Sequence, residues 1–555
     1  MKKMKKLLAL VLALTAVLSL AVGCQQNVPE DPNEFTEEVD PNRTQLYVGY
    51  YNGGLGMVWL KEVKAAFEKL YPDYQIMIDP GKDEYMDSQL EGSIKINRQD
   101  MYIDAQVDYY DFIKKGLIVD VTDAMTTPLT EFGENKSIAD KMNDSLKAYY
   151  QTSDGKYYGS PYMEAYHHMI YDVDLFDEYN LWFKDGGGFV SSPDDKKSAG
   201  QDGKYGTWDD GLPVTYSDFF KMMDCMVARG ITPLTWSGQY ADAYLTNFLK
   251  SVIADYEGEK FGTYWSYNGE VDVIVNKNFT EAGANRFELA DSDVQTVTVT
   301  NDNFADYMYR TTGKYFALKF AKDIVSNPMY RKYNYAESHT AVQRSFLMSN
   351  MEGVDQPIAM LIEGNWWINE ANEVFNEMAE YDSKYAKENR RFGVMPIPKA
   401  DDGSSASGHT VNPFSGGDQI FISSTSTKKD IAILFYRFLH TEQAMQLFTK
   451  YSGILKPFEY DLTSIYDSLH PYVQSFVDQR ENTEYIYMLP TVDKYKKDKD
   501  SRVFMQFGGL LRSRIFESTS SNPMSFFCDN SQYSAKDYLL GMEYIFATQV
   551  PAAMK

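Results

Sequence analysis

The sequence is poor in the residues that carry several common kinds of chemistry. It has 3 Cys and 6 His in 555 residues. Three cysteines are too few for a disulfide framework or a cysteine-rich zinc cluster. Positive charge is also scarce, because 79 Asp and Glu outnumber 54 Lys and Arg and leave a net charge of −25. Proteins that bind nucleic acid neutralise phosphates with Lys and Arg, so this charge argues against such a function.

Aromatic side chains, in contrast, are abundant. The chain contains 43 Tyr and 7 Trp, and its composition of 44% hydrophobic and 24% charged residues is typical of a folded globular protein. A length of 555 residues, at about 100–200 residues per domain, predicts more than one lobe. Rings with polar tips suit ligands that have both apolar faces and hydroxyl groups.

The one long apolar run lies at the N-terminus. Residues 1–6 are basic, Leu7 to Gly23 are apolar or small, and Cys24 follows. This order predicts a secretory signal peptide over residues 1–23. The end of the run, Leu20-Ala21-Val22-Gly23-Cys24, resembles the bacterial lipobox, with Ala21 where that motif usually has Leu. The resemblance implies cleavage before Cys24 and a lipid on its thiol; the alternative is an ordinary signal peptide with an incidental cysteine.

Residues 24–43 combine three prolines with many acidic and amide side chains. Such a segment cannot bury enough apolar surface to fold, so we expect a flexible, lipid-anchored tether. The protein would then sit at the outer face of a bacterial cell membrane. Of the other two cysteines, Cys225 lies among Phe and Met residues and is expected to be a buried thiol. The sequence leaves open whether Cys225 and Cys528 pair.

The body of the chain opens with a pattern typical of α/β proteins. Residues 45–49 and 75–78 read as strands, and between them Trp59, Val63, Phe67 and Leu70 recur at helical spacing before Pro72. A strand, a helix and a strand in this order predict a parallel sheet. Ligands of such sheets bind at the carboxyl ends of the strands, so the loop of residues 50–54 is expected to face a binding crevice.

Five later blocks follow in a characteristic order. They are residues 154–182, 213–236, 359–367, 392–398 and 416–424, the last followed by a helical pattern that contains Ile431, Leu434, Phe435 and Phe438. In amino-acid sequence and in order, these blocks resemble those of the extracellular solute-binding proteins of ABC importers, specifically the carbohydrate-binding family 1. The members of this family include maltose-binding-protein-like chains. The resemblance covers most of residues 44–460.

The resemblance implies a two-lobe periplasmic-binding-protein-like α/β fold of type II, with central sheets flanked by helices and a hinge of several strands. The expected lobes are discontinuous: residues 44–163 and 364–422 form lobe 1, and residues 164–363 and 423–555 form lobe 2. It further implies a monomeric, non-catalytic protein that captures a neutral sugar between the lobes, needs no cofactor, and delivers its ligand to the transmembrane subunits of an ABC permease. The length of the chain favours an oligosaccharide.

Three site residues follow from the resemblance. Trp366, in Glu-Gly-Asn-Trp, matches a position that stacks on sugar beside the hinge. Glu164, in Ser-Pro-Tyr-Met-Glu-Ala, matches a glutamate that accepts from sugar hydroxyls, although a structural hydrogen-bond role at the hinge is the alternative. Trp236, in Thr-Pro-Leu-Thr-Trp, aligns with an aromatic stretch that lines the cleft, in a block one residue shorter than in the family.

Further candidates come from their position in the chain. Tyr51 and Asn52 are proposed as ligand contacts because they lie in the loop after the first strand, and Tyr162 and Trp367 are further candidates. For Trp367 the favoured alternative is core packing. The pair His167-His168 invites a metal interpretation, but neighbouring residues on a strand point to opposite faces and cannot easily share one ion.

Residues 184–212 are rich in Gly, Asp, Ser and Lys and show no hydrophobic period, so they are predicted to form a loop insertion. Asp202, Asp209 and Asp210 gather there, and carboxylate oxygens on a tight loop are ligands for Ca²⁺. A structural calcium ion is therefore a candidate, and a solvated acidic turn is the alternative.

Two other functions remain open from the sequence. A surface-anchored glycoside hydrolase or lyase would need two carboxylates flanking a bond, about 5–9.5 Å apart, and 79 acidic residues allow a chance pair. A peptide-binding receptor on the same scaffold is the other. The sequence contains no nucleophile elbow, phosphate-binding loop or metal-ligand motif.

Overall fold

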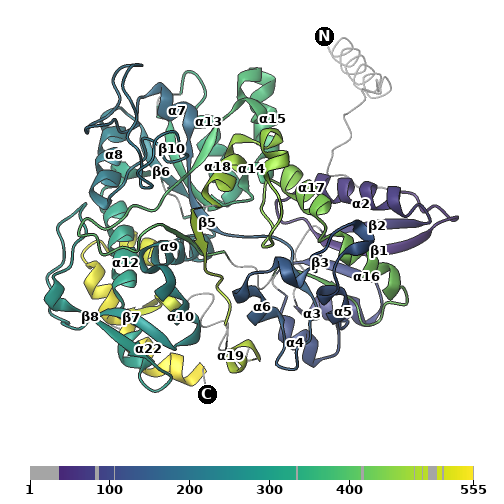
Figure 1. The fold of residues 1–555 in the computed structure, drawn as a ribbon. Coiled ribbons are helices and arrows are strands. Elements are labelled where there is room, and N and C mark those ends of the chain that lie inside the picture. Colours follow the sequence, from purple (N-terminus) through teal and green to yellow (C-terminus); the bar gives the residue numbers. More distant parts are fainter. Residues whose placement is uncertain are drawn as a thin grey trace, which may run out of the picture. The chain divides into compact units, whose positions relative to one another are not determined.

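The computed structural model describes residues 37–553 except 82–86, 106, 333–334, 355, 414–417, 481, 491, 498–508 and 516–517. The predicted signal peptide and Cys24, the predicted site of lipidation, lie outside the described residues. Helices and strands alternate along the chain and form two five-stranded sheets with helices against them (Figure 1). We call the part built on each sheet a lobe. None of the helices in the described part of the chain is long and apolar enough to cross a bilayer.

The first sheet has the strand order β2-β1-β3-β13-β4. Strands β1, β2 and β3 are parallel to one another, whereas β13 runs antiparallel to both β3 and β4. The strands are β1 (Thr44–Tyr51), β2 (Tyr74–Gly81), β3 (Met101–Asp104), β4 (Ser160–Pro161) and β13 (Gln419–Ile422). The parallel sheet expected from the opening strand–helix–strand pattern is confirmed.

Helix α2 (Val58–Leu70) covers this sheet because its apolar residues recur on one face. Trp59, Val63 and Phe67 are fully buried, but Leu70, expected on the same stripe, is exposed. Two helices from late in the chain complete the packing. Phe67 contacts the ring of Phe435 on α16 (Lys429–Phe438), and Trp59 meets that of Phe448 on α17 (Glu442–Ser452).

The second sheet has the order β11-β5-β10-β6-β9, in which β6, β9 and β10 are parallel and β5 is antiparallel to β10. Its strands are β5 (His167–Asp172), β6 (Thr232–Trp236), β9 (Arg331–Lys332), β10 (Ile358–Gly364) and β11 (Phe392–Met395). Every residue of β5 and β10 is buried. Strands covered on both faces read as continuous apolar runs, which explains the block Ala-Met-Leu-Ile in β10.

Helices enclose both faces of this sheet. One face carries the large core that includes α8 (Tyr216–Ala228), α9 (Ala241–Glu257) and α12 (Thr312–Ser326). Thr215 caps α8 by accepting from the backbone N–H of Asp218. A smaller core on the other face contains rings from α13 (His339–Ser349), α15 (Asn372–Tyr381) and α18 (Pro471–Arg480).

The segments that build each lobe differ from those expected from the sequence. Residues 364–422 were expected in the first lobe, but β11 pairs with β5, and α14 (Trp367–Glu370) and α15 pack in the second core. Conversely, α16 and α17 follow residue 422 and cover the first sheet. Among the described strands of the expected 364–422 segment, only β13 joins the first sheet.

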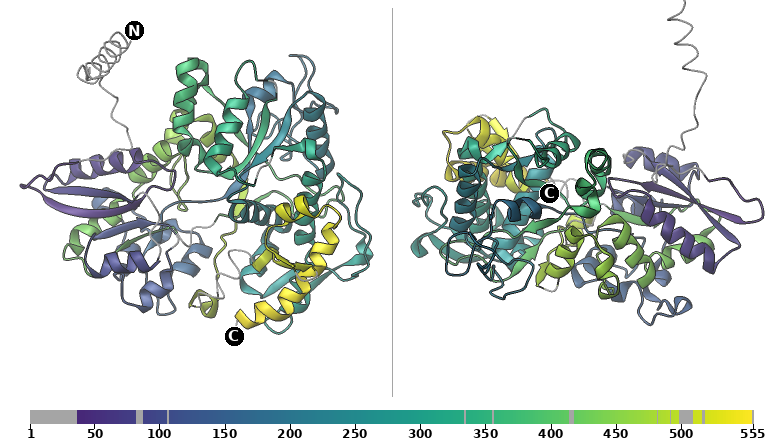
Figure 2. Two further views of the ribbon diagram at one scale, coloured as in Figure 1. Left: turned by 180° about the vertical axis from the view of Figure 1, so that it is seen from behind. Right: turned by 90° about the horizontal axis from the view of Figure 1, so that it is seen from above.

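The C-terminal region extends the second lobe. After α18, strand β14 (Thr483–Tyr485) pairs with β12 (His409–Val411), and the short helix α19 (Asp493–Lys497) follows. Helices α21 (Pro523–Asp529) and α22 (Ala535–Ala553) then pack on α12, as Figures 1 and 2 show. Cys225 and Cys528 are both free thiols, so the structure does not pair them.

The folded part begins inside the segment predicted to be a tether. The backbone N–H of Asp40 donates to Gln75, and Arg43 donates to the carbonyl of Pro72 and forms an ion pair with Glu68 at 2.8 Å. Residues 40–43 are therefore fixed against the first sheet. The predicted flexibility of residues 24–36 is outside the described residues.

Candidate functional site

Trp366 lies directly after strand β10, where the chain turns into α14. Its indole folds back over Gly364: a Cβ atom added to Gly364 would lie 2.3 Å from ring atom Cζ2. The motif Glu-Gly-Asn-Trp therefore requires glycine because the ring occupies the space of a side chain. Trp366 is half-buried, and His167, which pairs with Gly364 across the strands, meets its ring edge-on at 5.2 Å.

Further rings come from the turn after β6. Tyr244, on the first turn of α9, lies 6.1 Å from the Trp366 ring, and Tyr240 stacks on Tyr244 at an interplanar angle of 28°. His339, at the start of α13, contacts Tyr240 at 5.1 Å. We call these five residues the aromatic cluster. Tyr240 is exposed, and Tyr244 and His339 are half-buried, so the cluster presents ring surface to solvent.

The cluster lies where it does because β6 and β10 are parallel. Their carboxyl ends fall at the same edge of the sheet, and Tyr240 and Trp366 each follow one of these ends. His167 begins the antiparallel strand β5 and so reaches the same edge. This is the position where open α/β sheets bind their ligands.

Polar groups lie behind the rings. The side chain of Gln343 donates to Glu370 at 2.6 Å and to Glu363 at 3.4 Å, and His339 Nε2 lies 3.1 Å from Glu370 Oε1. Burial, and then the charge of Glu370, raise the pKa of Glu363 well above its ordinary value. Burial also lowers the pKa of His167 to about 3, so this ring is neutral at physiological pH. Neutral rings and hydrogen-bonding oxygens suit a hydroxyl-rich, uncharged ligand.

The loop after β1 brings the first lobe to this cluster. A Cβ atom added to Gly54 would lie 2.9 Å from Trp366 Cδ1, so only glycine lets the loop approach this closely. Tyr51 is half-buried at the end of β1, where the loop begins. The loop of residues 50–54, which was expected to face a binding crevice, therefore approaches Trp366. The side chain of Asn52 accepts from the backbone N–H of Gly56, which stabilises the loop.

Trp236 does not join the cluster. It is fully buried at the end of β6, where it pairs with Ile362 and belongs to the main core of the second lobe. A ring without accessible surface cannot stack on a ligand, so the aromatic surface expected at Trp236 is provided by Tyr240 and Tyr244.

Trp367 and Tyr162 are also fully buried. The Trp367 ring contacts Phe392 at 5.0 Å and Tyr472 at 5.7 Å, which agrees with core packing and not with the ligand contact that was proposed. Consecutive residues after β10 point in different directions, so Trp366 reaches the cluster while Trp367 enters the second core. Tyr162 has no exposed surface from which to reach a ligand.

Glu164 lies in the segment between β4 and β5 and is fully buried. Its Oε1 atom lies 3.9 Å from Arg480 and 3.5 Å from the hydroxyl of Tyr487. Burial raises the pKa of Glu164 to about 7, and Arg480 and Tyr487 only partly offset it. These contacts agree with the structural alternative for Glu164, because its carboxylate faces α18 and the C-terminal region and not the rings around Trp366.

His167 and His168 point to opposite faces of β5, as expected. His168 Nε2 lies 2.9 Å from the hydroxyl of Tyr472, whereas His167 contacts Trp366. Sequence reasoning rejected a metal site here but missed His167 as a cluster member, along with Tyr240, Tyr244 and His339. The signal for Tyr240 and Tyr244 was present, since both follow the block that ends at Trp236 and lie four residues apart, the spacing of one helical turn.

The acidic residues of the insertion serve the loop itself. Asp209 accepts from the backbone N–H groups of Gln201 at 2.6 Å and Asp202 at 3.0 Å, and Asp210 accepts from Gly206 at 2.7 Å. Within the described ranges, no three His, Cys, Asp or Glu side chains gather as metal ligands. A calcium ion at Asp202, Asp209 and Asp210 stays a prediction from the sequence.

A cavity of about 610 Å³ lies at the other end of the second sheet. It is lined by Asp172 and Arg390, which form a buried ion pair, and by the ion pair of Lys384 and Glu352. Asp172 ends β5 while His167 begins it, so the length of this strand separates the cavity from the aromatic cluster. Its charged lining is internally paired and differs from the ring surface around Trp366.

Solved structures of sugar-binding proteins are similar to this chain in fold. RafE in complex with raffinose matches with a TM-score of 0.52 and 14% identity over 91% of this chain and 100% of that chain. The cyclic α-maltosyl-1,6-maltose binding protein from Arthrobacter globiformis gives 0.52 and 15% over 92% and 99%. A protein from work on xylan utilization by Caldanaerobius polysaccharolyticus gives 0.53 and 13% over 90% and 99%.

The chain has their two-lobe fold. This confirms the α/β class and the maltose-binding-protein-like architecture expected from the blocks of sequence. At these identities the likeness establishes the fold and nothing further. No protein-family model and no curated protein sequence matches the chain.

The contact between Gly364 and Trp366 gives a first prediction. Gly364→Ala should displace the indole and lower the free energy of unfolding by about 1–3 kcal/mol, because the new methyl group overlaps the ring. Tryptophan fluorescence and chemical denaturation measure the two effects. Gly262→Ala is the matched control, since nothing lies within 4 Å of its added Cβ atom. An emission spectrum unchanged by Gly364→Ala would contradict this packing.

The raised pKa of Glu164 gives a second prediction. The folded state binds this proton more tightly than the unfolded chain, so the contribution of Glu164 to stability falls as pH rises from 4.5 to about 7. Glu164→Gln should remove this loss and stabilise the protein relative to wild type above pH 7, by up to about 3 kcal/mol. Denaturation of both proteins across this pH range tests it, with the exposed Glu352→Gln as control. Parallel pH profiles would show that Glu164 does not titrate there.

Proposed function

We propose that the protein is the non-catalytic substrate-binding component of a carbohydrate ABC importer. It captures a neutral sugar, with an oligosaccharide favoured, between its lobes and delivers it to the transmembrane subunits of the permease. The observation that carries this proposal is the aromatic cluster, which joins the carboxyl ends of β6 and β10 to the first-lobe loop at Gly54.

The chemistry of the cluster supports a sugar ligand. A sugar ring has apolar C–H faces that pack on flat side chains, and hydroxyl groups that bond to carboxylates and amides. Trp366 and Tyr240 provide partly exposed rings, and Glu370 and Gln343 provide oxygen and nitrogen atoms behind them. The fold supports the same ligand class, since structures of raffinose-bound and maltosyl-maltose-binding proteins share it.

The contact between the aromatic cluster and the first-lobe loop at Gly54 supports a receptor mechanism. A ligand favours the closed arrangement only through contacts that differ between the two states, and contacts to both lobes provide that difference. Gly54 approaches Trp366 from the first lobe, so closure about a sugar would involve this loop. The sugar would be released unchanged to the permease.

The N-terminal sequence supports attachment to the outer face of a bacterial membrane. Cys24 would carry the lipid, and the acidic, proline-containing segment that follows would let the folded part, a monomer, move above the surface. The alternatives are a surface-anchored glycoside hydrolase or lyase and a peptide-binding receptor. No described feature of the aromatic cluster favours either alternative. A hydrolase needs two carboxylates on either side of the scissile bond, whereas Glu363 and Glu370 both accept from the same side chain, that of Gln343.

A thermal-shift screen against raffinose, maltosyl, chito- and xylo-oligosaccharides tests the function. A true ligand at a hundredfold excess over Kd should stabilise the protein by about 2.7 kcal/mol. Trp366→Ala should abolish the shift because it removes the stacking surface, while Tyr381→Ala, an exposed ring on α15, should leave it unchanged. A shift retained by Trp366→Ala would remove the indole from the site. Recovery of cleaved glycan after prolonged incubation would support the hydrolase.

The lipid anchor is tested separately. Cys24→Ala expressed in a bacterium should abolish incorporation of a labelled fatty acid and move the protein from the membrane fraction to the soluble fraction. Cys225→Ala serves as the control, because this thiol lies in the folded part and should leave both properties unchanged. Labelling of the Cys24→Ala protein would contradict the assignment of the lipidated residue.

A further inference from the structure

Glu164 lies where the chain passes between the lobes. The described elements place three such passages: from β4 to β5, from β12, which packs on α9, to β13, and from α17 to α18. Glu164 is in the first passage, and its backbone N–H donates at 2.9 Å to the carbonyl of Leu455 in the third. Tyr487, which contacts its carboxyl group, precedes Met488, whose backbone N–H donates to the carbonyl of Pro413 in the second. The three passages therefore meet around one side chain.

The carboxyl group of Glu164 faces the guanidinium of Arg480 without reaching it. Glu164 Oε1 and Arg480 Nη2 are 3.9 Å apart, about 1 Å more than a charge-assisted hydrogen bond of about 2.7–2.9 Å. Glu164 Oε2 and Arg480 Nη1 are both buried and have no hydrogen-bond partner among the described residues. Buried polar atoms are almost always paired, so two unpaired atoms on facing, oppositely charged side chains indicate a contact that another arrangement of the chain completes.

The two groups belong to parts that a hinge motion displaces relative to each other. Arg480 ends α18, whose buried rings belong to the smaller core of the second lobe. Glu164 lies instead on the passage that leads from β4 of the first sheet. A rotation of the lobes therefore changes the distance between the carboxyl and guanidinium groups. The backbone carbonyl of Glu164 also accepts at 2.8 Å from the side chain of Asn365, the residue before Trp366, which connects this motion to the aromatic cluster.

Glu164 is the group of this contact that titrates near neutral pH. Burial raises the pKa of Glu164 to about 7, and the charge of Arg480 only partly offsets it. The guanidinium of Arg480 keeps its proton at such pH values. Burial also raises the pKa of each tyrosine close to the carboxyl group, so these rings stay neutral; they are Tyr166, Tyr460, Tyr485 and Tyr487.

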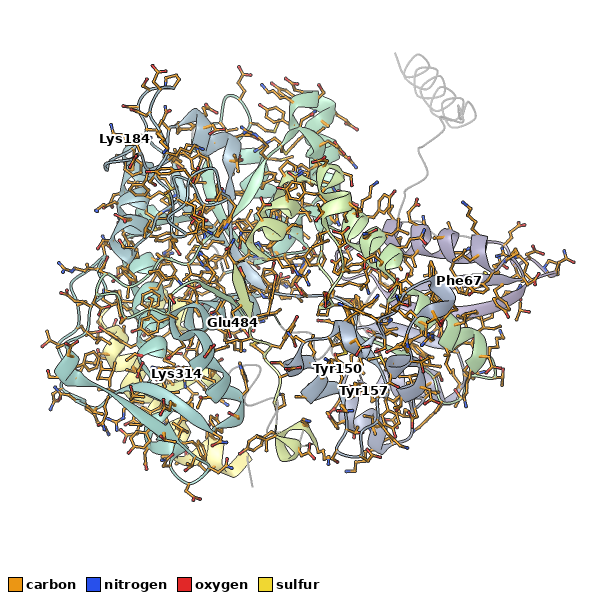
Figure 3. The ribbon with its side chains drawn as sticks, in the orientation of Figure 1. Phe67, Tyr150, Tyr157, Lys184, Lys314 and Glu484 are labelled. Carbon is orange, nitrogen blue, oxygen red and sulfur yellow. The ribbon has the colours of Figure 1, made fainter. Side chains whose placement is uncertain are left out.

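A further acidic side chain, Glu484, lies on β14 and is labelled in Figure 3. It is the neighbour of Tyr485, and successive residues of a strand point to opposite faces. Burial and then the charge of Glu259 raise the pKa of Glu484, whereas Glu484 is not among the groups that shift the pKa of Glu164. Its titration is therefore separate from that of Glu164.

We propose that Glu164 and Arg480 form a pH-dependent hinge lock, an ion pair that is open in the arrangement described here and closed in a second arrangement of the lobes. The open arrangement binds the Glu164 proton more tightly, so rising pH shifts the population toward the closed pair. With the closed pair at the ordinary pKa of 4.5, the ratio of the two arrangements changes by up to about 300-fold between pH 4.5 and about 7, and no further above it. The hinge lock goes beyond the proposed function, because it acts without a ligand.

Energy transfer between two dyes on the ligand-free protein tests the hinge lock. The dyes are attached through unnatural amino acids in place of Leu70 on α2 and Tyr381 on α15, which are exposed side chains of the first and second lobes. We expect the transfer efficiency of the otherwise unchanged chain to titrate between pH 4.5 and about 7 and to stay level up to pH 8. Glu164→Gln cannot ionise and should remove this titration. Glu352→Gln, which removes an exposed carboxylate at the other end of the second sheet, should retain it.

A transfer efficiency that does not change with pH, or that changes equally in Glu164→Gln, would overturn the hinge lock. Arg480→Gln removes the cation and should abolish the same titration. The double variant should behave like either single variant, because each removes the same interaction; additive effects would also overturn the lock. Circular dichroism shows which variants fold, and Glu164→Gln decides the result where Arg480→Gln does not. No sample contains sugar, so a failure of the proposed function leaves this result unchanged.

Discussion

The candidate site depends on how closely the Trp366 indole packs against two glycines. The ring lies over Gly364 of its own strand, and Gly54 of the first lobe approaches its Cδ1 atom. Any side chain at either position would occupy space that the ring or the loop now fills. These contacts fix the indole at the edge of the second sheet and bring the first lobe against it, so ring surface and both lobes meet at one place.

The same edge of the sheet shows why similar residues have different roles. Trp236, Trp366 and Trp367 all follow or end strands of the second sheet, but only Trp366 keeps accessible surface. Trp236 points into the large core, and Trp367 enters the smaller core beside Phe392 and Tyr472. Burial, which depends on the helices that cover each face, separates a binding ring from a packing ring.

The C-terminal region is more than an extension of the second lobe. It buries the carboxylate of Glu164 beneath Arg480 and Tyr487, and through α19 it contacts both lobes. A buried carboxylate beside an imperfect ion pair is costly to desolvate, and its raised pKa reflects that cost. Glu164 lies in the segment between β4 of the first sheet and β5 of the second. Arg480 and Tyr487, more than 300 residues later in the chain, therefore cover the chain where it passes between the lobes.

The sequence by itself determined the local elements and the fold class. Helical spacing and the strand–helix–strand order identified α2 and the parallel pairing of β1 with β2, because these patterns act between near neighbours. Trp366 was proposed from the resemblance to the carbohydrate-binding family 1. Tertiary structure alone decided which lobe each late segment joins, that Tyr240, Tyr244, His167 and His339 gather around Trp366, and that Glu164 faces Arg480. These outcomes depend on which helices cover which face of a sheet, and that packing joins residues hundreds of positions apart, where a single sequence carries no distance information.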